Sequence, residues 1–210
     1  MGGQDYAIAL PNIIDDYKTL SKKWRKALFV ERFFTERLKK IGLLVNPYCK
    51  IIDVRINKRD FPVIVMKKYS DFGFEVLDGK NPHTSNFNRS KAMLDQKNMT
   101  VENLVTFFEG CCKDIGILIQ ENINLGSKDA LNLAYQNGNF RLFLNDLGYC
   151  KQQNEKFDTQ VMTDLYIDWL LLTFGNILSD PEYYLFDTNF HYKSESLKKL
   201  KISLKDRILI

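Results

Sequence analysis

The sequence predicts an α+β protein, mainly helical, in which a basic helix and a small antiparallel sheet precede an acidic helical bundle and a C-terminal strand. Three observations support this class. Apolar residues recur at helical spacing between positions 20 and 41, β-branched residues alternate with charged ones between 52 and 66, and helical spacing with capping residues returns after position 100. The 210 residues, 45% hydrophobic and 27% charged, are typical of a folded globular chain.

The first predicted element is an amphipathic helix with one apolar stripe. That stripe contains Leu20, Trp24, Ala27, Phe34, Leu38 and Ile41. Gly42 follows as a residue suited to end a helix, because it adopts left-handed backbone conformations without steric cost. Most cations of this segment fall off the stripe, so we expect them to face solvent or a ligand.

A small antiparallel meander is expected next. Ile52, Val54 and Ile56 predict one strand, Val63–Met66 a second and Phe74–Leu77 a third. Residues 57–60 would form a charged hairpin tip, and Asp78-Gly79 a closing turn. The polar stretch 79–99 then suggests a boundary between a subdomain of residues 1–99 and one of residues 100–210.

The second half predicts helices joined by short turns. Thr100 would cap the first, Ser127 a second ending near Asn137-Gly138, and Asn139 a third ending at Gly148. A long helix should run from Asp158 or Thr159 to residue 178. Near the end, apolar residues at 200, 202 and 204 alternate with polar ones, which predicts a last strand that returns to the sheet.

Charge is segregated along the chain although the net charge is only +4. Residues 1–99 carry 19 basic and 11 acidic side chains, residues 100–190 carry 5 and 13, and residues 191–210 carry 6 and 2. The segment 18–40 alone has nine cations and two anions. Such a field determines what the surface attracts, and here it favours nucleic acid or an acidic protein surface.

The helix with its following hairpin resembles the last helix and wing of a winged-helix domain, a likeness that rests on element order and charge. The resemblance implies DNA binding, and a similarity to small winged-helix subunits of large ATPase or DNA-processing complexes implies an accessory role. The residues expected to contact nucleic acid are Lys22, Lys23, Arg25, Lys26, Arg32, Arg37, Lys39, Lys40, Lys58 and Arg59.

An alternative hypothesis is a metal-dependent nuclease. Asp78-Gly79-Lys80, after two apolar residues, resembles the acid-x-Lys element of the restriction-endonuclease-like superfamily, with Asp60 and Glu75 as further acids. Carboxylates on adjacent strand ends can hold a divalent cation, and a lysine nearby can stabilise the scissile phosphate. A tight turn at Asp78-Gly79 explains the same residues without chemistry.

Other catalytic classes lack their motifs. No phosphate-binding glycine loop is present, and the two histidines and four cysteines form no triad or zinc motif, so no cofactor or metal is predicted. We therefore predict no catalysis, a cytoplasmic location and no membrane partner, because no stretch has the length or character of a signal or membrane helix. The aromatic residues of the second half, Phe107, Phe108, Phe140, Phe143, Tyr166, Trp169 and Phe174, are expected in the core.

The prediction is therefore a non-catalytic accessory or adaptor subunit that binds nucleic acid through its basic helix and hairpin and assembles through its helical region. A purely structural interaction protein, whose opposite charges join copies, is a further alternative. The nucleic-acid hypothesis requires that carboxylates of the same chain do not neutralise the cations of segment 18–40.

Overall fold

The computed structural model of the protein describes residues 6–9, 17–46, 48–56, 59–67, 75–77, 101–136, 139–153, 158–178 and 195–208. It confirms the α+β class, and more of these residues lie in helices than in strands. The predicted connection 79–99 and the capping residue Thr100 lie outside the described residues. None of the described helices is long and apolar enough to cross a membrane.

Helix α1 (Tyr17–Lys40) is the predicted basic helix. Leu28, Phe34 and Leu38 from its apolar side are buried. The helix ends at Lys40 and is followed by a turn at the expected Gly42, which has a φ of 86°. The amide of Gly42 donates to the carbonyl of Lys39 and that of Leu43 to the carbonyl of Leu38, both at 3.1 Å. These two bonds satisfy carbonyls that the last helical turn leaves unpaired.

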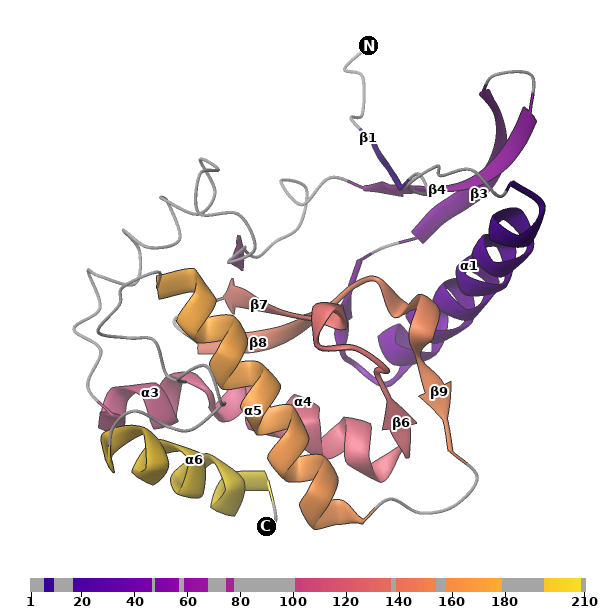
Figure 1. Cartoon of the computed structure of the whole chain (residues 1–210). Coiled ribbons are helices and arrows are strands. Elements are labelled where there is room, and N and C mark those ends of the chain that lie inside the picture. The colour runs from indigo at the N-terminus through magenta and orange to yellow at the C-terminus, as the bar shows by residue number, and fades with distance from the viewer. Residues whose placement is uncertain are drawn as a thin grey trace.

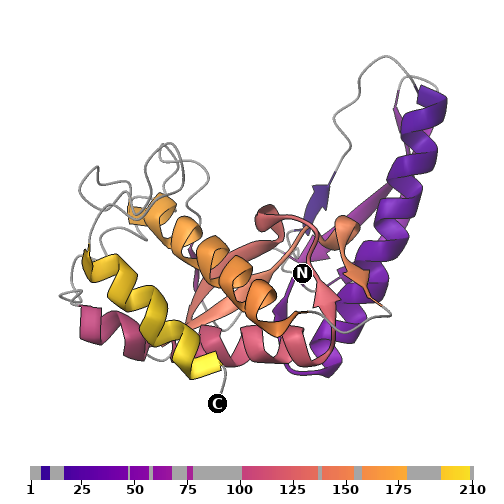
Figure 2. The same cartoon turned by 60° about the horizontal axis from the view of Figure 1, so that its bottom comes forward.

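A three-stranded antiparallel sheet contains β1 (Tyr6–Ala9), β4 (Arg59–Lys67) and β3 (Tyr48–Ile56), in the order β1-β4-β3. Two of its strands are those predicted from β-branched residues. The indole nitrogen of Trp24 on α1 donates to the carbonyl of Pro62 on β4 at 2.8 Å. Helix α1 and the β3–β4 ribbon therefore extend together away from the other helices (Figures 1 and 2).

The predicted third strand of the meander belongs to a different sheet. Strand β5 (Glu75–Leu77) pairs with β7 (Leu131–Gln136), in a four-stranded sheet of order β2-β8-β7-β5. Its remaining strands are β2 (Leu44–Val45) and β8 (Asn139–Leu144), which pair in parallel. The prediction that this strand is the third strand of the meander is therefore wrong, because the sequence of a three-residue strand does not specify which strand it pairs with.

The helices predicted from Ser127 to Gly148 are also corrected. Ser127 caps only the short 3-10 helix η2 (Lys128–Ala130), and β7 and β8 then form an antiparallel hairpin. Another 3-10 helix, η3 (Leu147–Tyr149), follows. These segments form strands because their apolar residues recur at every second position, which places them on one face of a strand. The residues of this face lie in one hydrophobic cluster and are Leu131, Leu133, Phe140, Leu142 and Leu144.

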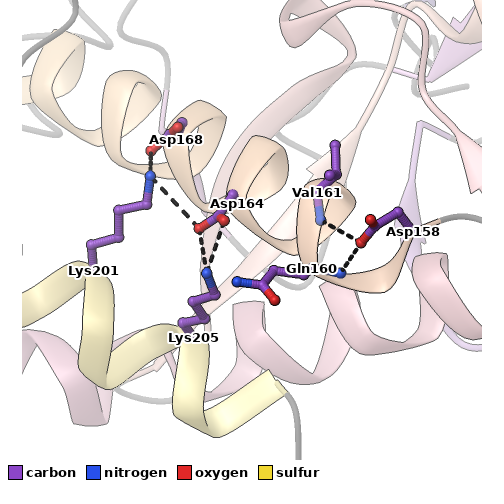
Figure 3. Close-up of polar contacts among 7 residues, drawn as sticks. All are labelled: Asp158, Gln160, Val161, Asp164, Asp168, Lys201 and Lys205. Atoms are coloured by element: carbon purple, nitrogen blue, oxygen red, sulfur yellow. Dashed lines mark hydrogen bonds and ion pairs between the residues drawn. The ribbon is translucent and has the colours of Figure 1, made fainter.

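Helices α3 (Val101–Phe107), α4 (Glu109–Gln120), α5 (Thr159–Leu178) and α6 (Glu195–Ile208) complete the fold. Helix α4 packs on β8, α5 packs on β7, and α6 contacts α3, α4 and α5. The predicted start of α5 is confirmed, because one carboxylate oxygen of Asp158 accepts from the amides of Gln160 and Val161 (Figure 3).

The predicted C-terminal strand is wrong, because residues 195–208 form α6. Leu200 and Leu204 are one helical turn apart and fully buried, whereas the side chain between them, Ile202, is 60% exposed. The Nζ atoms of Lys201 and Lys205 lie 2.6 Å from Asp168 and 2.8 Å from Asp164 on α5 (Figure 3). Leu200 and Leu204, like Lys201 and Lys205, are four residues apart and so lie on the same face of a helix. The ion pairs of the two lysines connect α6 to α5.

The core combines residues from both halves of the chain. Phe34, Leu38 and Val45 share one hydrophobic cluster with the later helices and with β7 and β8. Five of the seven predicted core aromatic residues are buried, whereas Phe107 and Trp169 pack against the core and are partly buried. The ring centroid of Phe108 lies 5.0 Å from that of Phe174 and 5.3 Å from that of Phe140. The boundary between residues 99 and 100 stays a prediction, although β2 and β5 lie in the sheet of the later strands.

Candidate nucleic-acid interface on helix α1

Helix α1 buries one side against the rest of the protein and leaves the opposite side in solvent. In both views no other described helix lies beside the side of α1 that faces away from helices α3–α6 (Figures 1 and 2). We define the outer face of α1 as its exposed residues from Lys23 to Lys40. They are Lys23, Arg25, Lys26, Phe29, Arg32, Phe33, Glu36, Lys39 and Lys40. The predicted exposure of this part of the basic segment is therefore present in the fold.

The three arginines of this helix each pair with a carboxylate. Arg25 lies 3.4 Å from Asp53 on β3, and Arg32 lies 3.3 Å from Glu36. Both pairs are solvent-exposed and contribute little to stability. Arg37 is different, because its guanidinium contacts Glu121 at 3.0 Å and the amide oxygen of Gln152 at 2.5 Å. Arg37 thus joins α1 to the small sheet of β6 (Ile123–Asn124) and β9 (Lys151–Gln152) and does not belong to the outer face.

The lysines of the outer face remain uncompensated within the described structure. Lys23, Lys26, Lys39 and Lys40 are exposed, and no described carboxylate forms an ion pair with them. At a rise of about 1.5 Å per residue, the helix spans roughly 25 Å from Lys23 to Lys40. These four ammonium groups are therefore distributed over a length that corresponds to several phosphates of a nucleic-acid strand.

The hairpin part of the predicted interface is described only in part. Lys58 lies outside the described residues, as do the side chains of Lys22 and Arg59. Arg59 begins β4 opposite Ile56. Beside this tip, Arg55 lies 4.0 Å from Asp60, and both side chains are exposed. The helix-then-hairpin order is observed, with β2 between the two. The described element before α1 is the strand β1, not the helix that would precede a recognition helix.

The sequence analysis missed two aromatic side chains on the same face. Phe29 is 65% exposed and Phe33 is 56% exposed. The ring of Phe33 meets the buried ring of Phe34 edge-on at 5.2 Å, whereas Phe29 has no such contact with a described ring. Their positions off the apolar stripe were visible in the sequence, since a helical projection places both among the cations.

The buried side of α1 carries an unusual carboxyl, Glu31. Burial, and secondarily the charge of Asp146, raise the pKa of Glu31 to about 7. Asp146 precedes η3 in the left-handed region, with a φ of 53°, and α1 packs directly on η3. Gly148 makes this approach possible, because a Cβ there would lie 3.1 Å from the methyl carbon of Ala27. The α1–η3 contact therefore brings two carboxyls near each other.

A second charged cluster lies between α4 and β8. Asp114, 1% exposed, accepts hydrogen bonds from Nε and Nη2 of Arg141 and from the amide of Leu142. Burial raises the pKa of the Asp114 carboxyl against the opposing effect of Arg141, whose own pKa is raised by Asp114. An open cavity of about 480 Å³ borders the pair and is also lined by Glu109, Lys113 and Asn139. Both groups of the ion pair are engaged by the fold, so this cluster is structural.

The acids of the nuclease alternative do not come together in the described part of the chain. Asp60 lies on β4 of the three-stranded sheet, and Glu75 begins β5 of the four-stranded sheet. Asp78 and Lys80 lie outside the described residues. Among the described residues no group of three His, Cys, Asp or Glu side chains could hold a metal ion. The structure thus gives this alternative no support.

Fold and surface together define an α+β protein that carries an exposed face of lysines and phenylalanines on one long helix. No model of a known protein family matches the sequence, and no curated protein matches it either.

Proposed function

We propose that this protein is a non-catalytic accessory subunit that binds nucleic acid through the outer face of α1. The observation that carries the proposal is the set of four exposed lysines, Lys23, Lys26, Lys39 and Lys40, which no described carboxylate neutralises. Phosphates attract such cations and release condensed counterions on binding, which supplies most of the affinity of non-specific complexes.

The placement of α1 also supports binding. The helix and the β3–β4 ribbon extend beyond the helices α3–α6, so none of these described helices blocks a polymer that lies along the outer face of α1 (Figures 1 and 2). The buried side of α1 is fixed by Leu28, Phe34 and Leu38 and by the bond from Trp24 to Pro62. A helix fixed in this way presents its cations in a defined arrangement before the ligand arrives, which lowers the entropic cost of binding.

The test is the salt dependence of binding to a fluorescein-labelled 20-nucleotide DNA strand and to its duplex. If the four lysines neutralise four phosphates, log K should fall against log salt with a slope of about −2.8 for the single strand and about −3.6 for the duplex. Replacing all four lysines with glutamine should abolish most of this slope. Absent or salt-insensitive binding by the unmodified protein would refute the proposal.

A matched control separates a specific face from net charge. Lys113, Lys128, Lys198 and Lys199 are also exposed but lie outside α1. Changing these four to glutamine also lowers the net charge from +4 to 0. We expect this control variant to keep most of the affinity and slope. Equal losses in the two quadruple variants would show that only overall charge matters, and the outer face would lose its role.

A further inference from the structure

We infer that the outer face of α1 is built for single-stranded nucleic acid, with Phe29 and Phe33 as stacking surfaces for unpaired bases. This inference rests on the proposed function and names the class of its ligand. Phe29 and Phe33 expose two phenyl rings to water, which is an unfavourable environment for apolar groups. Single exposed apolar residues are ordinary, whereas two large ones a turn apart on one face form a patch that marks a binding surface.

The spacing of rings and cations matches a strand with accessible bases. At about 100° per residue, Lys26, Phe33, Lys40 and Phe29 fall within a sector of roughly 60° around the helix axis. Along the axis they follow the order cation, ring, ring, cation over about 21 Å. A strand lying on this line can place phosphates at its two ends and bases on the rings between them. Single-strand binding proteins combine cations and aromatic side chains in this way.

The two other ligand classes fit less well. In a duplex the base faces are covered by their neighbours, so phenyl rings on a convex helix would gain only edge and methyl contacts. A protein partner that covered the rings would also have to desolvate Lys26 and Lys40, and lysine is depleted from the cores of protein interfaces. A single strand covers the rings with bases and leaves the ammonium groups next to solvated phosphates.

The experiment compares three labelled ligands of equal length: oligothymidine, an abasic strand that keeps the phosphates, and a duplex. The unmodified protein should bind oligothymidine more tightly than the other two. Replacing Phe29 and Phe33 with alanine should weaken binding to oligothymidine at least about tenfold, because both rings on which bases stack are removed. The same change should leave the abasic strand and the salt slope unaffected. Both side chains are exposed, so the variant should keep its fold, which its melting temperature checks.

A control variant and three contradicting outcomes complete the experiment. Ile202→Ala removes another exposed hydrophobic side chain, 60% exposed on α6, and should change no affinity. If oligothymidine and the abasic strand bind equally and the phenylalanine variant binds both as the unmodified protein does, this inference is overturned while the proposed function stands. If the duplex binds most tightly, the inference is likewise overturned. If the protein binds none of the three ligands, the proposed function fails as well.

Discussion

Replacing Glu31 with glutamine should stabilise the protein at alkaline pH and remove a pH dependence of its stability. Burial and the neighbouring Asp146 raise the pKa of Glu31 from 4.5 to about 7 in the folded protein. Between these two values the folded state keeps a proton that the unfolded state releases. Stability contributed by this group is therefore highest below about pH 4.5 and falls as the pH rises to about 7.

The size of the effect follows from the shift. A displacement of about 2.5 pKa units at 1.36 kcal/mol per unit corresponds to roughly 3 kcal/mol between the two ends of this range. Glutamine has nearly the same shape but no charge, so it avoids the penalty of an ionised carboxylate beside Asp146. We expect the variant to gain up to about 3 kcal/mol over the unmodified protein at pH 8, and much less at pH 5.

Urea unfolding of both proteins at pH 5 and pH 8 measures this difference, and the double difference isolates Glu31 from all other titrating groups. Glu36→Gln is the matched control, because Glu36 lies on the same helix with its side chain 56% exposed. Its effect should be the same at both pH values. A Glu31 variant whose stability changes with pH in parallel with the unmodified protein would refute the argument that α1 and η3 bury this carboxyl.

Two further predictions concern the fold. Asp114→Ala should destabilise the protein by about 3 kcal/mol in chemical denaturation, because it removes the buried carboxylate that accepts from Arg141 and from the amide of Leu142, and leaves Arg141 with only the Gly42 carbonyl. Adding Arg141→Met should recover part of that loss, and a double variant no more stable than the single one would contradict this account. Gly42→Ala should cost about 1–2 kcal/mol, because it forces alanine into the left-handed region, where the φ is 86°. Gly126→Ala, at a φ of 77°, should cost clearly more, because its Cβ would also meet the Tyr149 carbonyl, whereas nothing lies within 4 Å of a Cβ at Gly42. Equal melting temperatures of these two variants would contradict the role of that contact.

The elements predicted correctly are those with a long, unambiguous period. Helix α1 has an apolar stripe over six turns and a glycine at the required position, so both its extent and its end were readable. Strands β3 and β4 each have nine residues rich in β-branched side chains. Such segments determine their own secondary structure, because many of their residues favour the same backbone conformation.

The hairpin of β7 and β8 was readable but was misread. Asn137-Gly138 joins Leu131–Gln136 to Asn139–Leu144, and Asn-Gly between two alternating apolar runs is the strongest short-range indication of a hairpin. The capping residue Ser127 and the following polar residues suggested a helix instead. The cap exists, because the Ser127 hydroxyl accepts from the amide of Asp129, but only a three-residue 3-10 helix follows. A cap indicates where a turn begins and does not determine how long the helix is.

Helix α6 could not be assigned from its own residues. Apolar residues at 200, 202 and 204 satisfy a strand period, while Leu200 and Leu204 alone satisfy a helical one. The helix is favoured by partners more than 30 positions away, since Lys201 and Lys205 reach Asp168 and Asp164 only if both project from one helical face (Figure 3). The same limit applies to β5, whose partner β7 lies across more than 50 positions of sequence.

For the candidate site, the sequence likewise does not predict which charges are paired in the folded protein. The sequence counts cations but does not tell which of them the fold neutralises. On α1 the three arginines pair with Asp53, Glu36 and Glu121, whereas the described carboxylates leave the exposed lysines without ion pairs. A planar guanidinium forms directed bonds to carboxylates, whereas an ammonium group is more strongly hydrated and pairs where an acid lies close to it, as Lys201 and Lys205 do on α6. On the outer face of α1, the cations that form no ion pair with a described carboxylate are therefore lysines, and Phe29 and Phe33 lie among them. The affinity of this face for a ligand should depend on salt through the lysines and on exposed bases through the rings.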